Sequence, residues 1–160
     1  WLDKIDEIKE ACEKEGQTFF YASNFSMGVN ILFAINKQLA KIMNQFPEFE
    51  VTIDETHHIH KLDAPSGTAI TLAEDILKTV DRKKECKLNK REESSDLQIN
   101  SFREDEVPGI HSIKYESNID TIEISHIAKS RKGFALGAVL AAEYAATHKG
   151  FLGMENLLQF

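Results

Sequence analysis

The sequence predicts an α+β fold, with a mixed sheet of at least four strands and long helices on one face of it. Apolar residues recur at spacings of three and four over residues 27–45 and 134–148, which indicates two long helices. Apolar and polar residues alternate in four other segments, which is typical of half-buried strands. These segments are 49–56, 97–103, 110–116 and 119–127.

The N-terminal part predicts a short amphipathic helix over residues 3–15 that ends at Gly16. A buried strand is expected over residues 17–22, and a turn at 23–26 leads into the first long helix. A helix that feeds a strand in this way is typical of the last piece of a larger α/β unit. We therefore expect the chain to be a fragment of a longer enzyme.

The first long helix is predicted to bury one stripe of large apolar residues. The stripe consists of Leu32, Ile35, Leu39, Ile42 and Phe46, and it is widened by Val29, Phe33, Ala40 and Met43. A third helix is predicted over 68–80, after the histidine-rich segment. Residues 81–96 carry eleven charges of mixed sign in sixteen positions, so we expect a solvated connector there.

The last long helix is rich in glycine and alanine, so another element is expected to pack closely against it. The sheet is predicted to have one face without helices. We expect the outward positions of that face to include isoleucine, tyrosine and leucine residues, an apolar surface that a second copy of the chain would cover.

The composition excludes several classes of protein. The net charge is −7 and no basic stripe with interleaved aromatic residues occurs, which argues against a nucleic-acid partner. No apolar run is long enough to cross a membrane and no signal peptide is visible. The two cysteines, Cys12 and Cys86, lack metal-like spacing, so reduced thiols and a cytoplasmic location are expected.

Residues 55–69 concentrate the groups that can do chemistry. Three histidines, Lys61 and two carboxylates fall within nine positions, and a Pro-Ser-Gly-Thr run follows directly before the helix predicted over 68–80. Ser66 or Thr68 is a plausible N-cap of that helix. The first backbone N–H groups of a helix attract anions, and histidine titrates where a general acid must work. The segment therefore suits a small carboxylate or phosphate that receives a proton.

Other interpretations of the histidines stay open at this point. His57, His58 and His60 are a possible zinc set with Glu55 or Asp63, although adjacent histidines on a strand point to opposite faces. Alternatively, hydrogen bonds in a loop satisfy all three. His111 follows a Pro-Gly turn and either reaches the site or meets a neighbouring subunit.

The same segment resembles the signature of the dihydrodipicolinate reductase family, whose members are 4-hydroxy-tetrahydrodipicolinate reductases. It reads Glu-x-His-His-x-x-Lys-x-Asp-Ala-Pro-Ser-Gly-Thr-Ala over residues 55–69. The resemblance continues through residues 22–30, 122–126 and 131–139 and spans roughly residues 18–160. Members commonly carry arginine where this chain has Ile59, a position outside the shared skeleton of the signature.

The resemblance implies a set of functional residues. The catalytic pair is His57 as the acid/base group and Lys61 as the proton donor to the ring. The substrate-binding residues are His58, Ser66, Gly67, Thr68 and Arg131. The cofactor-binding residues are Ala22, Ser23, Asn24 and Phe25. No metal is implied.

The resemblance also implies an activity and an organisation. The enzyme reduces a hydroxy-tetrahydrodipicolinate dianion with NADPH or NADH in lysine and diaminopimelate biosynthesis, and it is a homotetramer. Residues 1–24 are the remnant of a Rossmann-type dinucleotide-binding domain, and residues 25–150 form the substrate-binding and oligomerisation domain. Residues 151–160 form a tail that returns towards the nucleotide domain. The alternative from another class is a stand-alone dicarboxylate-binding or assembly module without catalysis.

Overall fold

The computed structural model describes residues 2–159. Trp1 and Phe160, the first and last residues of the predicted domains, lie outside this range. The chain forms two compact units. One consists of Trp1–Asn30 with Lys132–Phe160, and the other of Ile31–Arg131. No helix in the described part of the chain is both long enough and apolar enough to span a membrane.

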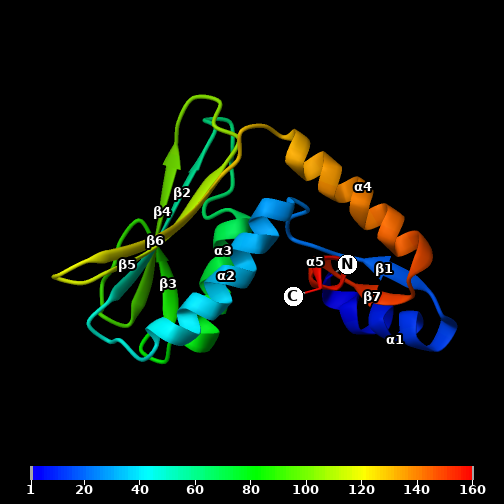
Figure 1. Cartoon of the computed structure of the whole chain (residues 1–160), viewed down its shortest axis with the longest axis horizontal. Helices are drawn as coiled ribbons and strands as arrows, with labels where there is room; N and C mark the ends of the chain where they lie inside the picture. The colour runs from blue at the N-terminus through cyan, green and yellow to red at the C-terminus, as the bar shows by residue number, and fades with distance from the viewer. Residues whose placement is uncertain (1, 160) are drawn as a thin grey trace. The chain divides into compact units, whose positions relative to one another are not determined.

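The larger unit is built on a five-stranded sheet in the order β3-β4-β2-β5-β6 (Figure 1). The strands are β2 (Glu50–His57), β3 (Glu85–Leu88), β4 (Asp96–Arg103), β5 (Ile110–Glu116) and β6 (Thr121–Ile127). β3, β4 and β2 run parallel to one another, whereas β5 is antiparallel to β2 and β6 is antiparallel to β5. The predicted mixed sheet is therefore confirmed, with one strand added at the β3 edge.

Two helices, α2 (Met27–Met43) and α3 (Gly67–Thr79), lie on the same side of this sheet (Figure 1). Burial alternates strictly along β2, so that Val51 and Ile53 face the helices and are fully buried. Ile113 and Tyr115 of β5 continue the same covered face. The core of the unit lies between this face and α3. Four side chains of α3 are buried there: Ala69, Leu72, Ala73 and Ile76.

The connector predicted over residues 81–96 is wrong in part, because it contains β3 and a buried lysine. The Lys83 ammonium donates to the carbonyl oxygens of Ser94 and Asp96, both at 2.7 Å, and also pairs with Glu50. A buried ammonium is tolerated only when its donors are satisfied. The edge of β4 also offers backbone partners to this segment, and these long-range contacts outweigh its charged composition.

The stripe predicted for α2 is confirmed in part, because the helix is rotated towards the residues that widen it. Of the five central residues only Leu32 is buried, while Ile35, Ile42 and Phe46 are exposed. The buried face contains Ala40 and Met43 of the widening set together with the polar Asn36. They are accompanied there by Val29 and Phe33. The Asn36 amide donates to the carbonyl oxygen of Leu72 at 3.1 Å, so a hydrogen bond between the two helices fixes the rotation.

The open face of the sheet is polar over most of its length, and the expected apolar surface is present only at one end of it. Its half-buried polar residues form hydrogen bonds with one another, such as those from Asn100 to Asp54 at 2.7 Å and from Ser112 to Ser125 at 2.8 Å. Ile113 and Tyr115 face the helices, whereas Ile110, Ile127 and Phe102 share the open face, with Ile127 and Phe102 exposed. The register decides this, because a shift of one residue moves every side chain to the other face.

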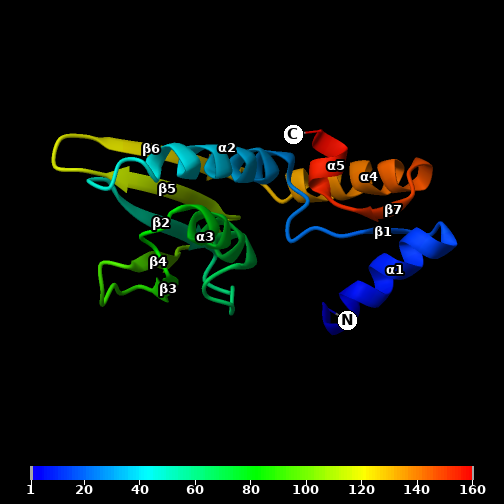
Figure 2. The ribbon, with the colours of Figure 1, turned by 90° about the horizontal axis from the view of Figure 1, so that it is seen from below.

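The smaller unit contains a parallel pair of short strands, β1 (Thr18–Phe20) and β7 (Gly150–Leu152). Helix α1 (Ile5–Glu15) lies on one side of the pair, and α4 (Lys132–Thr147) lies on the other (Figure 2). A 3₁₀ turn (Leu2–Lys4) precedes α1, and α5 (Met154–Leu158) follows β7. As predicted, α1 ends at Gly16, whose φ of 63° is left-handed.

The expected close packing of α4 occurs at Gly137. A Cβ atom added there would lie 1.7 Å from the carbonyl oxygen of Phe25, so only glycine lets the helix approach this turn. The Asn24 side chain accepts from the N–H of Ser26 at 2.8 Å and shapes the same turn. Both thiols of the chain are free, Cys12 buried and Cys86 exposed.

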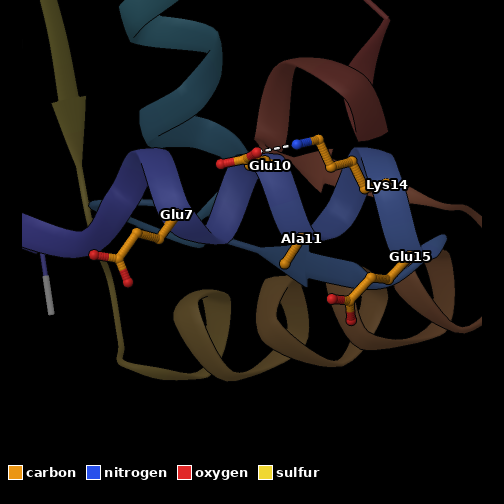
Figure 3. Close-up of a pocket in the computed structure, with 5 residues that line it drawn as sticks. All are labelled: Glu7, Glu10, Ala11, Lys14 and Glu15. Carbon is orange, nitrogen blue, oxygen red and sulfur yellow. Dashed lines mark hydrogen bonds and ion pairs between the residues drawn. The ribbon is translucent and has the colours of Figure 1, made fainter.

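A shallow hollow lies on the outer side of α1 (Figure 3). It is lined by side chains of this helix alone, mostly acidic. The residues are Glu7, Glu10, Ala11, Lys14 and Glu15. Lys14 pairs with Glu10 one turn earlier, so the hollow is a surface of a charged helix rather than a built site.

Candidate functional site

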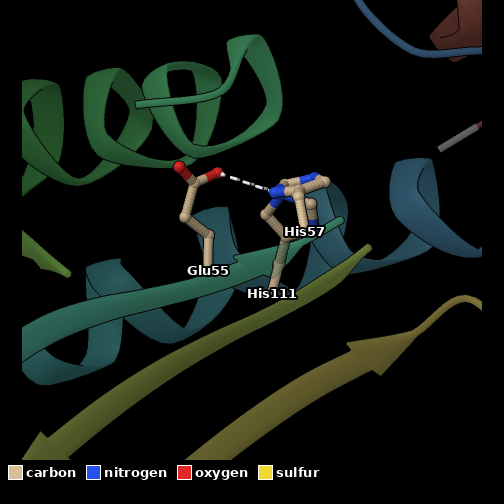
Figure 4. A group of neighbouring side chains, drawn as sticks. All are labelled: Glu55, His57 and His111. Atoms are coloured by element: carbon tan, nitrogen blue, oxygen red, sulfur yellow. Dashed lines mark ion pairs between the residues drawn. The ribbon is translucent and has the colours of Figure 1, made fainter. Parts of the chain in front are cut away.

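The end of β2 and the start of β5 bring three ionisable side chains together beneath α3 (Figure 4). Glu55 and His57 are two residues apart on β2, so they share its helix-facing side. His111 lies directly opposite Glu55 in the antiparallel register, so its side chain points to the same face. All three side chains are buried.

The first turn of α3 is tied to this group through Ser66. Ser66 is the N-cap of the helix, and its Oγ accepts from the N–H of Ala69 at 3.2 Å. Its own N–H donates to both Glu55 carboxylate oxygens, at 3.0 and 3.2 Å. Its hydroxyl also lies 3.2 Å from His111 Nε2. The helix terminus and the strand ends therefore form one hydrogen-bonded structure.

Glu55 is a fully buried carboxylate with a well-satisfied negative charge. Besides the Ser66 N–H, it accepts a short hydrogen bond of 2.6 Å from the Ser101 hydroxyl. Burial raises the pKa of its carboxyl, but the hydrogen bonds from Ser101 and Ser66 outweigh burial, so the pKa lies below the ordinary value. Glu55 is thus an anion at neutral pH, in contact with a helix N-terminus.

The two histidines beside it are held neutral. Burial lowers the pKa of His57, and the attraction of Glu55 opposes this effect only in part. Burial, followed by the repulsion of His57, lowers the pKa of His111 to about 4. The rings meet edge to face with their centroids 5.0 Å apart. A neutral imidazole is ready to exchange a proton with a bound molecule.

The loop between β2 and α3 carries Lys61 next to this buried group. The Lys61 ammonium binds both oxygens of Asp63, at 2.7 and 2.9 Å. Arg103 at the end of β4 holds this loop in place, because its guanidinium donates to the carbonyl oxygens of Lys61 and Asp63 at 3.2 and 2.6 Å. The same guanidinium lies 3.9 Å from Glu55 Oε1. The site thus combines a held cation, neutral imidazoles and a helix N-terminus, which is the set needed to bind an anion and transfer a proton to it.

The family model for the C-terminal region of dihydrodipicolinate reductase matches residues 28–158. The chain belongs to the dihydrodipicolinate reductase family. A curated relative from Christiangramia forsetii, named 4-hydroxy-tetrahydrodipicolinate reductase, is 49% identical over 158 residues. The match covers 99% of this chain and 66% of the relative, so the chain spans just under two thirds of the relative's length.

A solved structure has a similar fold. It is the dipicolinate-bound dihydrodipicolinate reductase of Paenisporosarcina sp. TG-14, with a TM-score of 0.70 and 22% sequence identity. The similarity covers 94% of this chain and 58% of that one. At this identity the match supports the α+β fold and nothing finer.

The structure places most of the residues that the family resemblance singles out around the N-terminus of α3. Ser66 and Thr68 are buried there, and Gly67 has open space where a side chain would be. His58 follows His57 at the end of β2 and is half-buried. His60, in contrast, is exposed and pairs with Glu106 at 3.1 Å.

Two sets of predicted residues lie outside the segment from β2 to α3. Arg131 is exposed at the last position of the larger unit. The turn at residues 22–25 belongs to the smaller unit, where Asn24 and Phe25 are half-buried and Ser23 is exposed. Their assignments to substrate and cofactor stay predictions.

The zinc set considered for His57, His58 and His60 does not converge. The described residues with ligand atoms within 4.8 Å of one another are Glu55, His57 and His111 instead. Sequence reasoning considered Glu55 only as a possible zinc ligand and left His111 undecided between the site and a neighbouring subunit. The alternation of β2 contained the signal for Glu55, because residues 55 and 57 share a face. Ser101 and Arg103 carried no comparable signal, since their contacts depend on the register of β4 with β2.

Proposed function

We propose that this chain forms the substrate-binding part of an NAD(P)H-dependent reductase that converts 4-hydroxy-tetrahydrodipicolinate to tetrahydrodipicolinate in lysine and diaminopimelate biosynthesis. One observation carries the proposal: Lys61, the buried His57 and the N-terminus of α3 converge at the end of β2 in a chain of this family. The names of the curated relative and of the dipicolinate-bound structure support the same substrate class.

The geometry of α3 suits one carboxylate of the substrate. Gly67 leaves the helix terminus accessible, and the partial positive charge of the terminus favours an anion there. Ser66, Gly67 and Thr68 then hold the carboxylate, with His58 beside them. Arg131 is proposed to meet the substrate's other end, because a guanidinium binds a carboxylate through two parallel hydrogen bonds.

The proton transfers are assigned to His57 and Lys61. Loss of the substrate hydroxyl as water also removes a proton from the ring, and neutral His57 is the acid/base group that accepts this ring proton and passes it to the departing oxygen. Reduction leaves an electron pair on the ring, and the Lys61 ammonium donates the proton that this pair takes. The Lys61 ammonium is bound to both carboxylate oxygens of Asp63 in this structure.

The nicotinamide nucleotide supplies the hydride. The turn of residues 22–25 is proposed to line its binding site, and its observed bracing fits that role, since Asn24 and the close approach of Gly137 fix its backbone. We assign residues 1–24 to the end of a dinucleotide-binding domain, 25–150 to the substrate-binding and oligomerisation domain and 151–160 to a returning tail. The pairing of β7 with β1 is compatible with the last assignment.

A homotetramer in the cytoplasm is proposed by resemblance to the family. The open face of the described sheet combines polar, hydrogen-bonding residues with exposed Phe102 and Ile127 at one end, and we propose that the contact uses this face. Light scattering of the purified chain tests this, and a stable 18.1 kDa monomer would contradict it.

Calorimetry with pyridine-2,6-dicarboxylate tests the anion pocket directly. We expect binding to the 160-residue chain that Lys61→Ala weakens by ~1.5–3 kcal/mol, the range for a hydrogen bond to a charged group. His148→Ala is the matched control, because the His148 ring is exposed and its hydrogen-bond partners among the described residues are Tyr144 and Thr147 of its own helix end. Equal affinity of the Lys61→Ala variant and the parent would contradict the pocket. Binding by a complete enzyme that shows no turnover would favour the alternative, a dicarboxylate-binding module.

A further inference from the structure

Glu55 has no task in the proposed reaction, yet it is the most completely enclosed charge in the site. Its side chain is 0% exposed, and it joins three elements. It accepts from Ser66 at the start of α3 and from Ser101 on β4, and its Oε2 lies 3.4 Å from His57 Nδ1 on its own strand. Such a charge is costly to bury unless it is fully used.

We propose that Glu55 is a positioning residue, which fixes the orientation and the tautomer of His57 and ties them to the first turn of α3. This inference rests on the proposed function, because it assigns Glu55 a task only if His57 exchanges a proton with the substrate. Glu55 itself does not touch the substrate; it acts through His57 and Ser66.

The surroundings of the His57 ring favour one tautomer. Nδ1 is buried and has no hydrogen-bond partner among the described residues, and it faces the anionic Glu55 oxygen. A lone pair on Nδ1 would be repelled by that oxygen, whereas an N–H is attracted to it. The proton of neutral His57 therefore sits on Nδ1, and Nε2 is left with the lone pair for the substrate.

Gly109 keeps the other side of the ring clear. A Cβ atom at Gly109 would lie 3.2 Å from His57 Nε2, tighter than ordinary packing allows. His111 completes the enclosure on the β5 side, where its Nε2 is 3.2 Å from the Ser66 hydroxyl. The ring of His57 is thus confined between a carboxylate, a histidine and a glycine.

A metal ion is the competing occupant of the same cluster, and the contacts argue against it. Ser66 N–H already engages both Glu55 oxygens, and the Ser66 hydroxyl engages His111 Nε2. The guanidinium of Arg103 lies 3.9 Å from Glu55, and the positive charges of Arg103 and Lys61 both lower the pKa of His57. The cluster is therefore built to balance one anion with N–H donors and nearby positive charge, and an added cation would compete with them.

The experiment reads the His57 imidazole itself, by ¹⁵N NMR of the 160-residue chain across a pH titration. The charged groups that act on His57 are Glu55 and Asp63, which raise its pKa, and Lys61 and Arg103, which lower it. In Glu55→Gln the pKa of His57 should fall by about 1 pH unit or more, the usual effect of removing an opposite charge at this distance. The Nδ1–H tautomer of the parent should also give way to Nε2–H.

The matched control is Glu116→Gln, which removes a carboxylate of the same sheet that pairs only with Lys114 among the described residues. It should leave both the pKa and the tautomer of His57 unchanged. The resonances of His126 and His148 serve as internal references in every sample.

Three outcomes would overturn the inference. The first is a folded Glu55→Gln chain with unaltered His57. The second is an Nε2–H tautomer in the parent chain, which decides the matter even if the variant fails to fold. The third is stoichiometric binding of added Zn²⁺ at micromolar concentration that requires Glu55 and His111, which would make the cluster a metal site. Because no substrate or nucleotide is present, failure of this test leaves the dicarboxylate calorimetry intact, and the converse also holds.

Discussion

Two regions of the site hold their charges in opposite ways. In the buried cluster the protonation states of Glu55, His57 and His111 are set by enclosure and by hydrogen bonds. In the adjoining loop the ammonium of Lys61 is paired with Asp63, whose side chain is 59% exposed. The first arrangement costs folding free energy and resists solvent, whereas an ion pair with an exposed partner costs little. The proton-exchanging group is therefore held by enclosure, and the proposed proton donor is held by a single carboxylate.

Removing the side chain of His57 or of Lys61 should cause the largest loss of activity. In a complete reductase that contains this chain, His57→Ala and Lys61→Ala should each lower turnover by ~10²–10⁴, the range for general acid–base catalysis. His148→Ala should leave turnover unchanged, because that ring stacks on Tyr144 at the end of α4 and has no role in the proposed site. Steady-state kinetics decide this, and equal behaviour of the three variants would show that the histidine segment is not the catalytic centre.

Burial of His111 in the cluster should make the stability of the folded chain sensitive to acid. The pKa of His111 is about 4 in the folded chain against an ordinary 6.5, so between these values only the unfolded chain binds the proton. The free energy of unfolding therefore falls as the pH drops from about 6.5 to 4, by about 3 kcal/mol in total at about 1.4 kcal/mol per pH unit.

The variant His111→Gln should lose this part of the pH dependence, and His148→Gln should keep it. Urea unfolding at several pH values measures both. A His111→Gln chain that is as acid-sensitive as the parent would mean that the cluster does not hold His111 neutral.

A change to the ion pair of Lys61 with Asp63 should give the smallest effect, and it should appear in the binding of a dianion. Asp63→Asn removes a negative charge beside Lys61, so a dianion should bind somewhat more tightly, by about two- to fivefold for an exposed pair. The gain should shrink as salt is added, because exposed charges are screened. Calorimetry with pyridine-2,6-dicarboxylate at low and high salt measures it. Weaker binding by the variant would show that Asp63 holds Lys61 in a position that the pocket needs.

Local rules were sufficient for the parts of the site that lie close together in sequence. Pro65 and the apolar run after it located the start of α3, and Ser66 is one of the two N-caps expected there. The half-buried strand before the histidines was also predicted correctly. Strand alternation implies that residues 55 and 57 share a face, which the structure confirms.

What failed depended on distant contacts. The place of His111 beside Glu55 follows from the β2–β5 register, which no local pattern specifies. The rotation of α2 follows from the bond between Asn36 and Leu72, and a purely apolar count misses a buried amide. β3 was missed because its sequence is charged, whereas the strand exists by pairing with β4.

The buried, fully hydrogen-bonded ammonium of Lys83 has a consequence for chemical labelling. Its side chain is 0% exposed and its proton donors are occupied, so an acylating reagent reaches its nitrogen only after the β3–β4 edge opens. Lys87, four residues along on β3, has a side chain that is 34% exposed and needs no such opening. The ratio of the two labelling rates therefore measures how often this edge of the sheet separates.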